Sequence, residues 1–426
     1  MNEKVAQCSF CRQIQSDETP LIAGLDGHIC ESCARLAAQV VESWGRKRSV
    51  AEPLKDLPVP HEIKRRLDEY IIGQDAAKLT LAVAVYNHYK RLQAETGAMD
   101  KAMAAERVEL EKSNILLLGP SGSGKTLLAS TLAGIVGVPF AIADATTLTQ
   151  AGYVGEDVDS IIMRLLDGAD GNREAAEWGI VYIDEVDKLA RAGESAYAAR
   201  DVSGEGVQQA LLKLVEGTSV RVNERGRKGQ EAAALDTRNI LFIAGGAFSG
   251  LEGIVKRRLR PRNTGIGFHS IPDSDRGKQP EPDLFARTHP DDLRHFGLIP
   301  EFIGRFPVIT ALHELDEAAL VRILTEPRNA LVRQYQQLFS YEGVTLDFEP
   351  AALSAIAHDA VQRGTGARGL RSVMESLLKQ VMYDLPSETG VERCNVTEAA
   401  AQGESEVTYT YRESETAEPS AGAAAG

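Results

Sequence analysis

The sequence has no long hydrophobic run, and two common protease motifs are also missing. No stretch of ~18 apolar residues occurs, so we expect no transmembrane helix. The first eight residues lack the apolar core of a secretory signal, which favours a cytoplasmic location. Neither a G-x-S-x-G nucleophile elbow nor an H-E-x-x-H zinc motif is found. We therefore expect no protease activity from the chain itself.

Positive charge is in short supply. Lys and Arg number 47 against 61 Asp and Glu, which gives a formal net charge of −14. This balance argues against nucleic acid as the main partner, although a local basic patch remains compatible with it. Otherwise the composition, 43% hydrophobic and 25% charged, is that of an ordinary globular protein, and 426 residues suggest two to four domains.

Cysteine is scarce, and its placement is uneven. Four of the five cysteines, Cys8, Cys11, Cys30 and Cys33, form a C-x2-C-x18-C-x2-C pattern. Each C-x2-C knuckle places two thiolates on one tight turn, and two knuckles complete a tetrahedral Zn²⁺ site. Four cysteines leave no open position, so the predicted zinc is structural. Disulfides or a redox pair are the alternatives, and the isolated Cys394 is expected to be an inert thiol.

A glycine-rich loop directly follows a predicted buried strand at 115–118. It matches G-x-x-x-x-G-K-[ST] in full, and a helix is predicted to begin within it. Backbone N–H groups of such a loop surround phosphate oxygens, and the helix N-terminus adds positive potential. Lys125 is expected to reach the β- and γ-phosphates, and Thr126 to ligate Mg²⁺. The predicted nucleotide contacts of this segment are Gly119, Pro120, Ser121, Gly122, Ser123, Gly124, Lys125, Thr126 and Leu127.

Two adjacent carboxylates supply a second part of the predicted ATP site. Asp184 and Glu185 follow the apolar run 180–183, which places them at the carboxyl end of a strand, where open α/β sheets bind ligands. We expect Asp184 to hold Mg²⁺ through water and Glu185 to polarise the attacking water. An exposed acidic pair at a strand end is the alternative.

The order of predicted elements indicates an α/β fold. Short apolar runs alternate with helical patterns, which predicts a doubly wound parallel sheet. The predicted strands are 114–118, 140–144, 180–183, 239–244 and 308–312. Helical patterns dominate after these strands. The expected organisation is a zinc-binding domain over 1–48, a linker over 49–60, a large ATPase domain over 61–312, a smaller, mainly helical domain over 313–412, and a disordered tail over 413–426.

Further segments make the pattern specific. They are Tyr70–Gln74, Gly152–Gly155, Arg200–Gln209, Pro300–Arg305 and Gly366–Arg371. Together with the cysteine cluster they resemble the ClpX family of AAA+ protein-unfolding ATPases, from the cysteine cluster to about residue 385. The resemblance implies a ring-forming AAA+ ATPase, a homohexamer that uses ATP and Mg²⁺ and carries a structural zinc.

The resemblance also assigns roles around the ATP site. It implies that Ile71 and Ile72 contact adenine, although ordinary packing at a helix start would explain both residues equally well. Arg305 matches an arginine finger that enters the neighbouring subunit's ATP site and offsets charge on the γ-phosphate. Arg368 matches a sensor arginine that reads the γ-phosphate within the same chain, with Arg371 as the second choice.

Two positions depart from the expected pattern. In the wider AAA+ class the strand predicted at 239–244 ends in a polar residue such as Asn, but here Gly245 and Gly246 follow it, so the second sensor position is unassigned. The family has an Arg-Lys-His triplet in a basic loop at the channel entrance. This chain has Arg-Gly-Arg-Lys at 225–228, which leaves the tag preference open, and a solvated charge run is the competing interpretation.

The resemblance further implies a substrate channel and a docking loop. Tyr153 and Val154, between two glycines, match the loop that grips the translocating polypeptide, and Arg200 begins a match to the second pore loop. In isolation, a buried or turn tyrosine would be the simpler interpretation. Exposed apolar residues on a polar loop are costly unless they dock into something. The family uses such a tripeptide to dock on the ClpP peptidase ring, and the matching residues are Ile266, Gly267 and Phe268.

The predicted function is therefore an ATP-dependent unfoldase that binds tagged proteins and adaptors, pulls substrates through a pore and delivers them to a ClpP-type peptidase. The resemblance implies that the zinc module dimerises and recruits substrates or adaptors. A nucleic-acid motor or clamp-loading ATPase is one competitor, because it would share the ATP site. A zinc-dependent binding module with a degenerate ATPase is the other, and the intact Lys125, Asp184, Glu185 and Arg305 argue against it.

Overall fold

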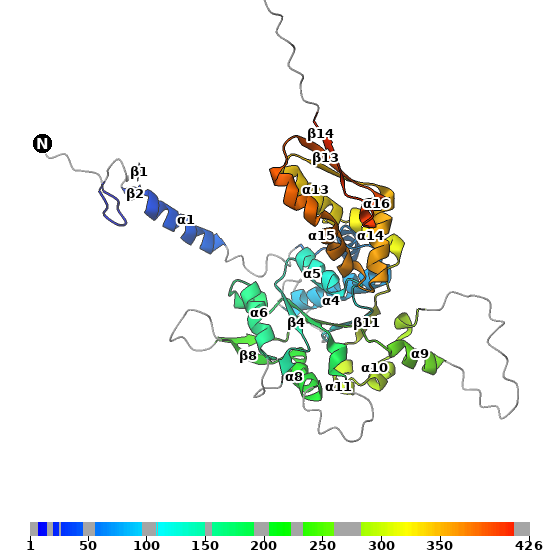
Figure 1. Cartoon of the computed structure of the whole chain (residues 1–426). Helices are drawn as coiled ribbons and strands as arrows, with labels where there is room; N and C mark the ends of the chain where they lie inside the picture. The colour runs from blue at the N-terminus through cyan, green and yellow to red at the C-terminus, as the bar shows by residue number, and fades with distance from the viewer. Residues whose placement is uncertain are drawn as a thin grey trace, which may run out of the picture. The chain divides into compact units, whose positions relative to one another are not determined.

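The computed structural model describes most of the chain, which divides into two compact units, 1–56 and 57–426 (Figure 1). The described residues are 7–14, 20–24, 27–45, 56–95, 108, 110–149, 156–190, 204–222, 233–259 and 283–412. None of the helices in these ranges is long and apolar enough to cross a membrane. Several predicted features lie outside them: Tyr153, Val154, Arg200, the basic loop 225–228, Ile266, Gly267, Phe268 and the tail 413–426.

The N-terminal unit is built on a short hairpin. Strand β1 (Leu21–Ala23) pairs antiparallel with β2 (His28–Cys30), with Leu21 opposite Cys30. Helix α1 (Glu31–Gly45) begins directly after β2. This arrangement places one C-x2-C knuckle at the junction of β2 and α1, and the other knuckle in the segment before the hairpin.

A five-stranded parallel sheet forms the centre of the second unit. Its order is β11-β3-β10-β7-β4, so that the strand with the glycine-rich loop, β3, lies between β11 and β10. All four pairings are parallel. The strands are β3 (Ile115–Leu118), β4 (Phe140–Asp144), β7 (Ile180–Asp184), β10 (Leu241–Gly246) and β11 (Val308–Ala311). The five predicted strands and the α/β class are confirmed.

Every residue of β3 and β10 is buried, so both faces of the sheet are covered at its centre. Helix α6 illustrates how the sequence achieves this, since its apolar residues recur at helical spacing and all four at 161, 162, 165 and 166 are buried. The longer helices around the sheet are α3 (Pro60–Asp68), α4 (Asp75–Glu95), α5 (Lys125–Val136), α6 (Ser160–Gly168), α8 (Gly204–Glu216) and α9 (Leu251–Leu259).

Shorter elements complete this part of the chain. Two small two-stranded sheets pair β5 with β6 and β8 with β9. These elements are β5 (Leu148–Thr149), β6 (Glu156–Asp157), α7 (Arg173–Ala176), η2 (Val186–Leu189), β8 (Ser219–Val222), β9 (Ala233–Asp236), η4 (Phe285–Arg287), α10 (Pro290–Phe296) and α11 (Pro300–Gly304).

The C-terminal part has its own hydrophobic core, formed by buried residues between Leu320 and Val407. Four helices and a three-stranded sheet, in the order β12-β13-β14, enclose it. The helices are α12 (Glu317–Thr325), α13 (Leu331–Tyr341), α14 (Pro350–Gln362) and α15 (Ala367–Asp384). The remaining elements are β12 (Thr345–Phe348), η5 (Leu385–Ser387), β13 (Val391–Val396), α16 (Glu398–Ala401) and β14 (Thr408–Tyr411). The sequence predicted the helical character but missed this sheet.

Candidate nucleotide and zinc sites

The glycine-rich loop connects the buried strand β3 to helix α5, as predicted. Gly119, Gly122 and Gly124 have φ values of 144°, 79° and 97°, which are unfavourable for residues with a side chain. Close contacts add to this requirement at two of them. A Cβ atom on Gly119 would overlap the carbonyl oxygen of Leu312, and one on Gly122 would lie 2.8 Å from the carbonyl oxygen of Thr365. The loop is therefore packed against the C-terminal part of the same chain.

Lys125, the first residue of α5, is buried within the loop. Its ammonium group donates hydrogen bonds to the carbonyl oxygens of Gly119 (2.7 Å) and Pro120 (2.8 Å). Burial lowers the pKa of Lys125 from its usual value, because it removes the charged form from water. A phosphate group at the loop would offset that cost, which agrees with the predicted contact of Lys125 with ATP. The neighbouring Leu127 is exposed, which leaves it accessible to a nucleotide.

The Asp184 carboxylate, at the end of β7, accepts three hydrogen bonds from described residues. The Thr126 hydroxyl donates to its Oδ2 atom (3.0 Å), while the Tyr182 hydroxyl (3.1 Å) and the backbone N–H of Glu185 (3.0 Å) donate to Oδ1. The structure thus brings together Thr126 and Asp184, which the sequence predicted as a metal-binding pair. Tyr182 was not predicted to have a role. Residues two apart along a strand lie on the same face of the sheet, and this spacing would have placed Tyr182 beside Asp184.

Glu185 has a strained backbone. Its φ and ψ of 57° and 32° lie in the left-handed region, which costs a non-glycine residue about 1–3 kcal/mol. This conformation turns the chain from β7 into η2 directly after Asp184. The Glu185 carboxylate is exposed and has no hydrogen-bond partner among the residues that the structure describes. Such a group is accessible to a water molecule, as its predicted role requires.

The segment before α4 lies against the loop. Ile71 and Ile72 are both buried, which agrees with an adenine contact and equally with helix-start packing. Gln74 connects three parts of the chain. Its side-chain amide donates to the carbonyl oxygens of His313 (2.9 Å) and Ser123 (3.4 Å), and its side-chain oxygen accepts from the His313 N–H (2.9 Å). Local sequence patterns assign no separate role to Gln74, because these partners are distant along the chain.

The two candidate sensor arginines differ in what they contact. Arg368, at the start of α15, donates a hydrogen bond to the Ser121 hydroxyl in the glycine-rich loop (3.4 Å). Arg371 instead donates to Gln334 within the C-terminal part (2.9 Å). The geometry therefore favours Arg368, which the family resemblance also indicates, over Arg371 as the sensor arginine.

Arg305 points to a different partner. Its guanidinium group donates to the Glu216 carboxylate through Nε (2.9 Å) and Nη2 (2.7 Å), and about half of each side chain is exposed. Its backbone carbonyl accepts a hydrogen bond from Asn114 next to β3. Among the described residues, Arg305 forms no hydrogen bond or ion pair with the glycine-rich loop of its own chain. This placement agrees with a finger that acts on a neighbouring subunit.

The four N-terminal cysteines converge. Their sulfur atoms all lie within 4.8 Å of one another, and all four thiols are free. Cys11 Sγ and Cys30 Sγ are 3.6 Å apart, whereas a disulfide requires ~2.05 Å. A tetrahedral Zn²⁺ with Zn–S bonds of ~2.3 Å would hold its sulfurs about 3.8 Å apart. The arrangement fits a closed zinc site and contradicts the disulfide alternative.

Interactions within this cluster shift the pKa values of its thiols in opposite directions. Hydrogen bonds from backbone groups, that of Cys11 first, lower the pKa of Cys8 to about 6. The neighbouring Cys30 sulfur raises the pKa of Cys33 to about 12. Thiolates packed this closely cannot all ionise without a cation, which is the electrostatic condition that a bound Zn²⁺ satisfies.

Three family models match the chain in succession. They are the ClpX C4-type zinc finger over residues 6–43, the AAA domain (Cdc48 subfamily) over 110–309, and the C-terminal, D2-small domain of ClpB protein over 315–398. The ATP-dependent Clp protease ATP-binding subunit ClpX 3 of Methylococcus capsulatus is 58% identical over 97% of this chain and 96% of its own length. The chain belongs to the ClpX family. The ATP-dependent Clp protease ATP-binding subunit ClpX of Azotobacter vinelandii is 60% identical over 91% of this chain and 88% of that protein.

Membership of the ClpX family settles the reaction class and the cofactors. The chain is an AAA+ ATPase that hydrolyses ATP with Mg²⁺, and it carries Zn²⁺ in its zinc finger. The residues present fit these groups, since Thr126 and Asp184 offer the hard oxygen donors that Mg²⁺ prefers, and the four cysteines offer thiolates for Zn²⁺. The degenerate-ATPase alternative is therefore wrong.

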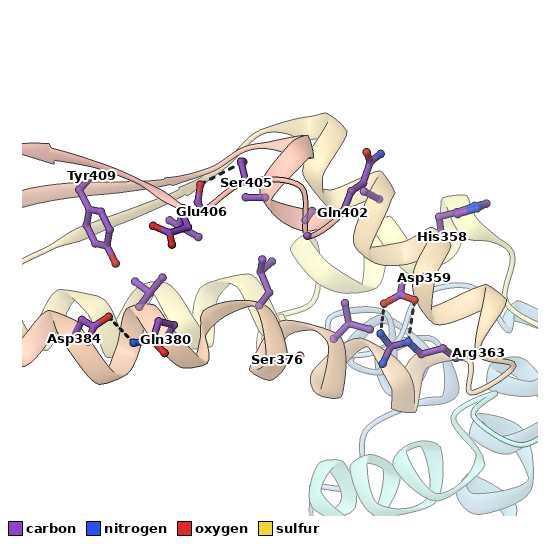
Figure 2. A pocket seen from close by; sticks show the side chains of 18 of the residues that line it. His358, Asp359, Arg363, Ser376, Gln380, Asp384, Gln402, Ser405, Glu406 and Tyr409 are labelled. Carbon is purple, nitrogen blue, oxygen red and sulfur yellow. Dashed lines mark hydrogen bonds and ion pairs between the residues drawn. The ribbon is translucent and has the colours of Figure 1, made fainter.

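The C-terminal part also contains a groove. It has a volume of about 980 Å³ and lies among α14, α15 and the segment from α16 to β14. Figure 2 shows the Asp359–Arg363 and Gln380–Asp384 pairs along it. It includes no residue that the sequence predicted for the ClpX-family nucleotide, metal, pore or docking sites.

Proposed function

We propose that this ClpX-family chain is a subunit of a homohexamer that unfolds tagged proteins with the energy of ATP hydrolysis. It would pass them through a central pore into a ClpP-type peptidase ring. The names of its relatives support a place in the Clp protease, because both are ATP-binding subunits of that protease. The observation that carries the proposal is the contact of the C-terminal part with the phosphate loop, through Arg368 on Ser121 and Thr365 against Gly122.

The arrangement suggests how hydrolysis proceeds. The backbone of 119–124 and the Lys125 ammonium would bind the phosphates, while Thr126 and Asp184 would hold the metal. When bound, Mg²⁺ would supply positive charge to offset the charge that develops on the phosphate oxygens. Glu185 orients and deprotonates the attacking water.

The same arrangement suggests how hydrolysis becomes movement. Arg368 belongs to the C-terminal part and Ser121 to the phosphate loop. The arrival or departure of the γ-phosphate would therefore change what Arg368 contacts. Thr365 lies against Gly122 at the same place, which means that a small shift of the loop displaces the C-terminal part. A rotation between the two parts would then transmit the nucleotide state to the pore. The separate cores of these parts, one between Leu116 and Phe306 and the other between Leu320 and Val407, support such a rigid-body motion.

Further roles are proposed from the resemblance to the ClpX family, several of them for segments outside the described residues. Arg305 would enter the ATP site of the neighbouring subunit, which requires a ring. Tyr153, Val154 and Arg200 would line the pore and grip the polypeptide. The tripeptide Ile266, Gly267 and Phe268 would dock the peptidase ring, and the zinc-binding domain would recruit substrates or adaptors. We also propose the division into domains 1–48, 61–312 and 313–412 that the sequence predicts.

The deciding experiment uses a folded fluorescent reporter that carries a degradation tag. With ATP alone, fluorescence should fall as the chain unfolds the reporter; with a ClpP-type peptidase added, peptide fragments should appear. The Glu185→Gln variant is the matched control and should do neither. Stimulation of the ATPase by DNA, with no effect of the tagged protein, would instead favour the nucleic-acid motor.

A further inference from the structure

The end of strand β10 lies at the centre of the ATP site but carries no polar side chain. β10 is the middle strand of the sheet, with β3 and the phosphate loop on one side and β7 with Asp184 on the other. It ends in Gly245 and Gly246, followed by Ala247. The position that the wider AAA+ class fills with a polar residue such as Asn has no side chain here.

A side chain from the neighbouring strand occupies the space beside Gly245. A Cβ atom on Gly245 would overlap the Tyr182 hydroxyl and would lie 2.9 Å from Cζ and 3.0 Å from Cε2 of the same ring. Real Cβ atoms hardly ever approach other atoms this closely, so a larger residue at 245 and a tyrosine at 182 exclude each other. Gly245 thus leaves the space that the Tyr182 side chain fills. The hydroxyl of Tyr182 lies where a short polar side chain from β10 would lie.

That hydroxyl is bonded to the metal-binding carboxylate. Tyr182 is fully buried, and its hydroxyl donates to Asp184 Oδ1 at 3.1 Å. The ordinary pKa of a phenol is about 10, so the hydroxyl is protonated and can donate at physiological pH. With Oδ1 held by Tyr182 and the Glu185 N–H, Oδ2 is the atom directed to Thr126.

We propose that the Tyr182 hydroxyl is a positioning group of the Mg²⁺–ATP site and replaces the polar side chain that β10 lacks. It fixes the rotation of the Asp184 carboxylate, so that Oδ2 faces the Thr126 hydroxyl. Asp184 Oδ2 and the Thr126 hydroxyl oxygen are then both available to one metal ion. Partners that orient a ligating carboxylate commonly change metal affinity or activity by about 10–100-fold when removed. The inference concerns ATP hydrolysis and does not rest on the proposed unfolding of proteins.

The first test is Tyr182→Phe in the full-length chain. Mn²⁺, which takes the same oxygen ligands as Mg²⁺, serves as the probe, and its binding in the presence of ADP is measured by electron paramagnetic resonance. We expect Mn²⁺ affinity to fall about tenfold. In steady-state ATP hydrolysis, kcat should fall by a similar factor, while KM for ATP changes less than about twofold, because the phosphate loop and Lys125 are untouched. Unchanged Mn²⁺ affinity in the folded variant would overturn the proposal.

A matched pair of double variants separates a positioning role from packing. Tyr182→Leu removes the ring atoms that a Cβ atom on residue 245 would meet. In Tyr182→Leu/Gly245→Ser, a hydroxyl returns from β10 to nearly the same place, and we expect most of the Mn²⁺ affinity and kcat to be restored. Tyr182→Leu/Gly245→Ala adds the same Cβ atom without a hydroxyl and should remain about tenfold impaired. If alanine rescued as well as serine, Tyr182 would act through packing and the proposal would be wrong. Because both double variants carry the same added Cβ atom, a general failure to fold would affect them equally and be seen in their melting temperatures.

Discussion

The carbonyl oxygen of Thr365 lies 2.8 Å from the position that a Cβ atom on Gly122 would occupy. Gly122 belongs to the phosphate loop and Thr365 precedes helix α15, so the C-terminal part of the chain is packed against the loop that binds ATP. Together with the bond from Arg368 to Ser121, this contact makes the interface between the two parts sensitive to whatever the loop holds.

We expect Gly122→Ala to destabilise the chain and weaken ATP binding. Its φ of 79° costs an alanine about 1–2 kcal/mol, and the new methyl group would push against Thr365. Gly134→Ala in helix α5 is the matched control, because no atom lies within 4 Å of its added Cβ. Gly134→Ala should raise the free energy of unfolding by about 0.5–1 kcal/mol. Thermal unfolding and nucleotide titration would show both effects, and equal melting temperatures for the two variants would contradict this reading of the loop.

The arginines 368 and 371 should differ in function. Arg368→Ala removes the contact with Ser121, and we expect ATP turnover to fall by about tenfold or more, since charge-assisted bonds to phosphate are among the strong ones. Arg371→Ala removes a bond to Gln334 away from the loop and should leave turnover within about threefold of the parent. Measured kcat values decide the matter, and the reverse order would move the sensor role to Arg371.

Glu185→Gln should separate ATP binding from hydrolysis. Glutamine has the shape of glutamate but is not a base, and general-base catalysis contributes about 10²–10⁴-fold to rate. We expect turnover to fall within that range while nucleotide affinity remains within about threefold of the parent. Equilibrium binding of a fluorescent ATP analogue and phosphate release would measure the two quantities. Hydrolysis at the parent rate would show that another group activates the water.

Zinc removal should affect the N-terminal unit and spare the ATPase core. Cys33→Ser takes one ligand from the cluster, and we expect metal content to fall from one zinc per chain to well below one. Cys394→Ala is the control, because Cys394 is buried in the C-terminal part and distant in sequence from the cluster. It should retain its zinc. Elemental analysis gives the stoichiometry, and full zinc content in Cys33→Ser would exclude a four-cysteine site.

Deletion of Ile266, Gly267 and Phe268 should uncouple the ATPase from the peptidase. We expect degradation of the tagged reporter to be lost, because apolar docking residues carry much of the energy of an interface. ATP turnover and unfolding without peptidase should remain, since these residues lie outside the predicted ATP site. Peptide release would be followed alongside phosphate release. Degradation at the parent rate after the deletion would remove this segment from the docking interface.

The sequence predicted the features that depend on local pattern. Buried parallel strands appear as apolar runs, which is why β3, β7 and β10 could be placed within about two residues. The phosphate loop and the cysteine knuckles could be found because their chemistry requires fixed spacing of glycines, lysine or thiols. The phosphate loop follows β3 and the second cysteine knuckle begins at the end of β2, as the order of elements along the chain requires.

The relationships that were missed cross between distant segments. The fit of Tyr182 against Gly245 depends on strand order, which no spacing within one strand reveals. The hydrogen bonds of Gln74 were also missed, because one of its partners, His313, is far away along the chain. Strand β13 was missed for a different reason: its residues, VERCNV, are half polar and form no apolar run, and only the pairing with β12 and β14 makes it a strand.

The ion pair between Arg305 and Glu216 has a consequence for assembly. An exposed pair of this kind stabilises by only about 0–1 kcal/mol, so releasing the guanidinium costs little. Glu216 therefore contacts the guanidinium without binding it tightly enough to prevent its release. On the proposed role of Arg305, the nucleotide of an adjoining subunit competes with Glu216 for one guanidinium group. When the ring closes, Arg305 would exchange the Glu216 carboxylate for the phosphate of the neighbouring nucleotide. The position of Arg305 would then depend on whether the ATP site of the adjoining subunit is filled.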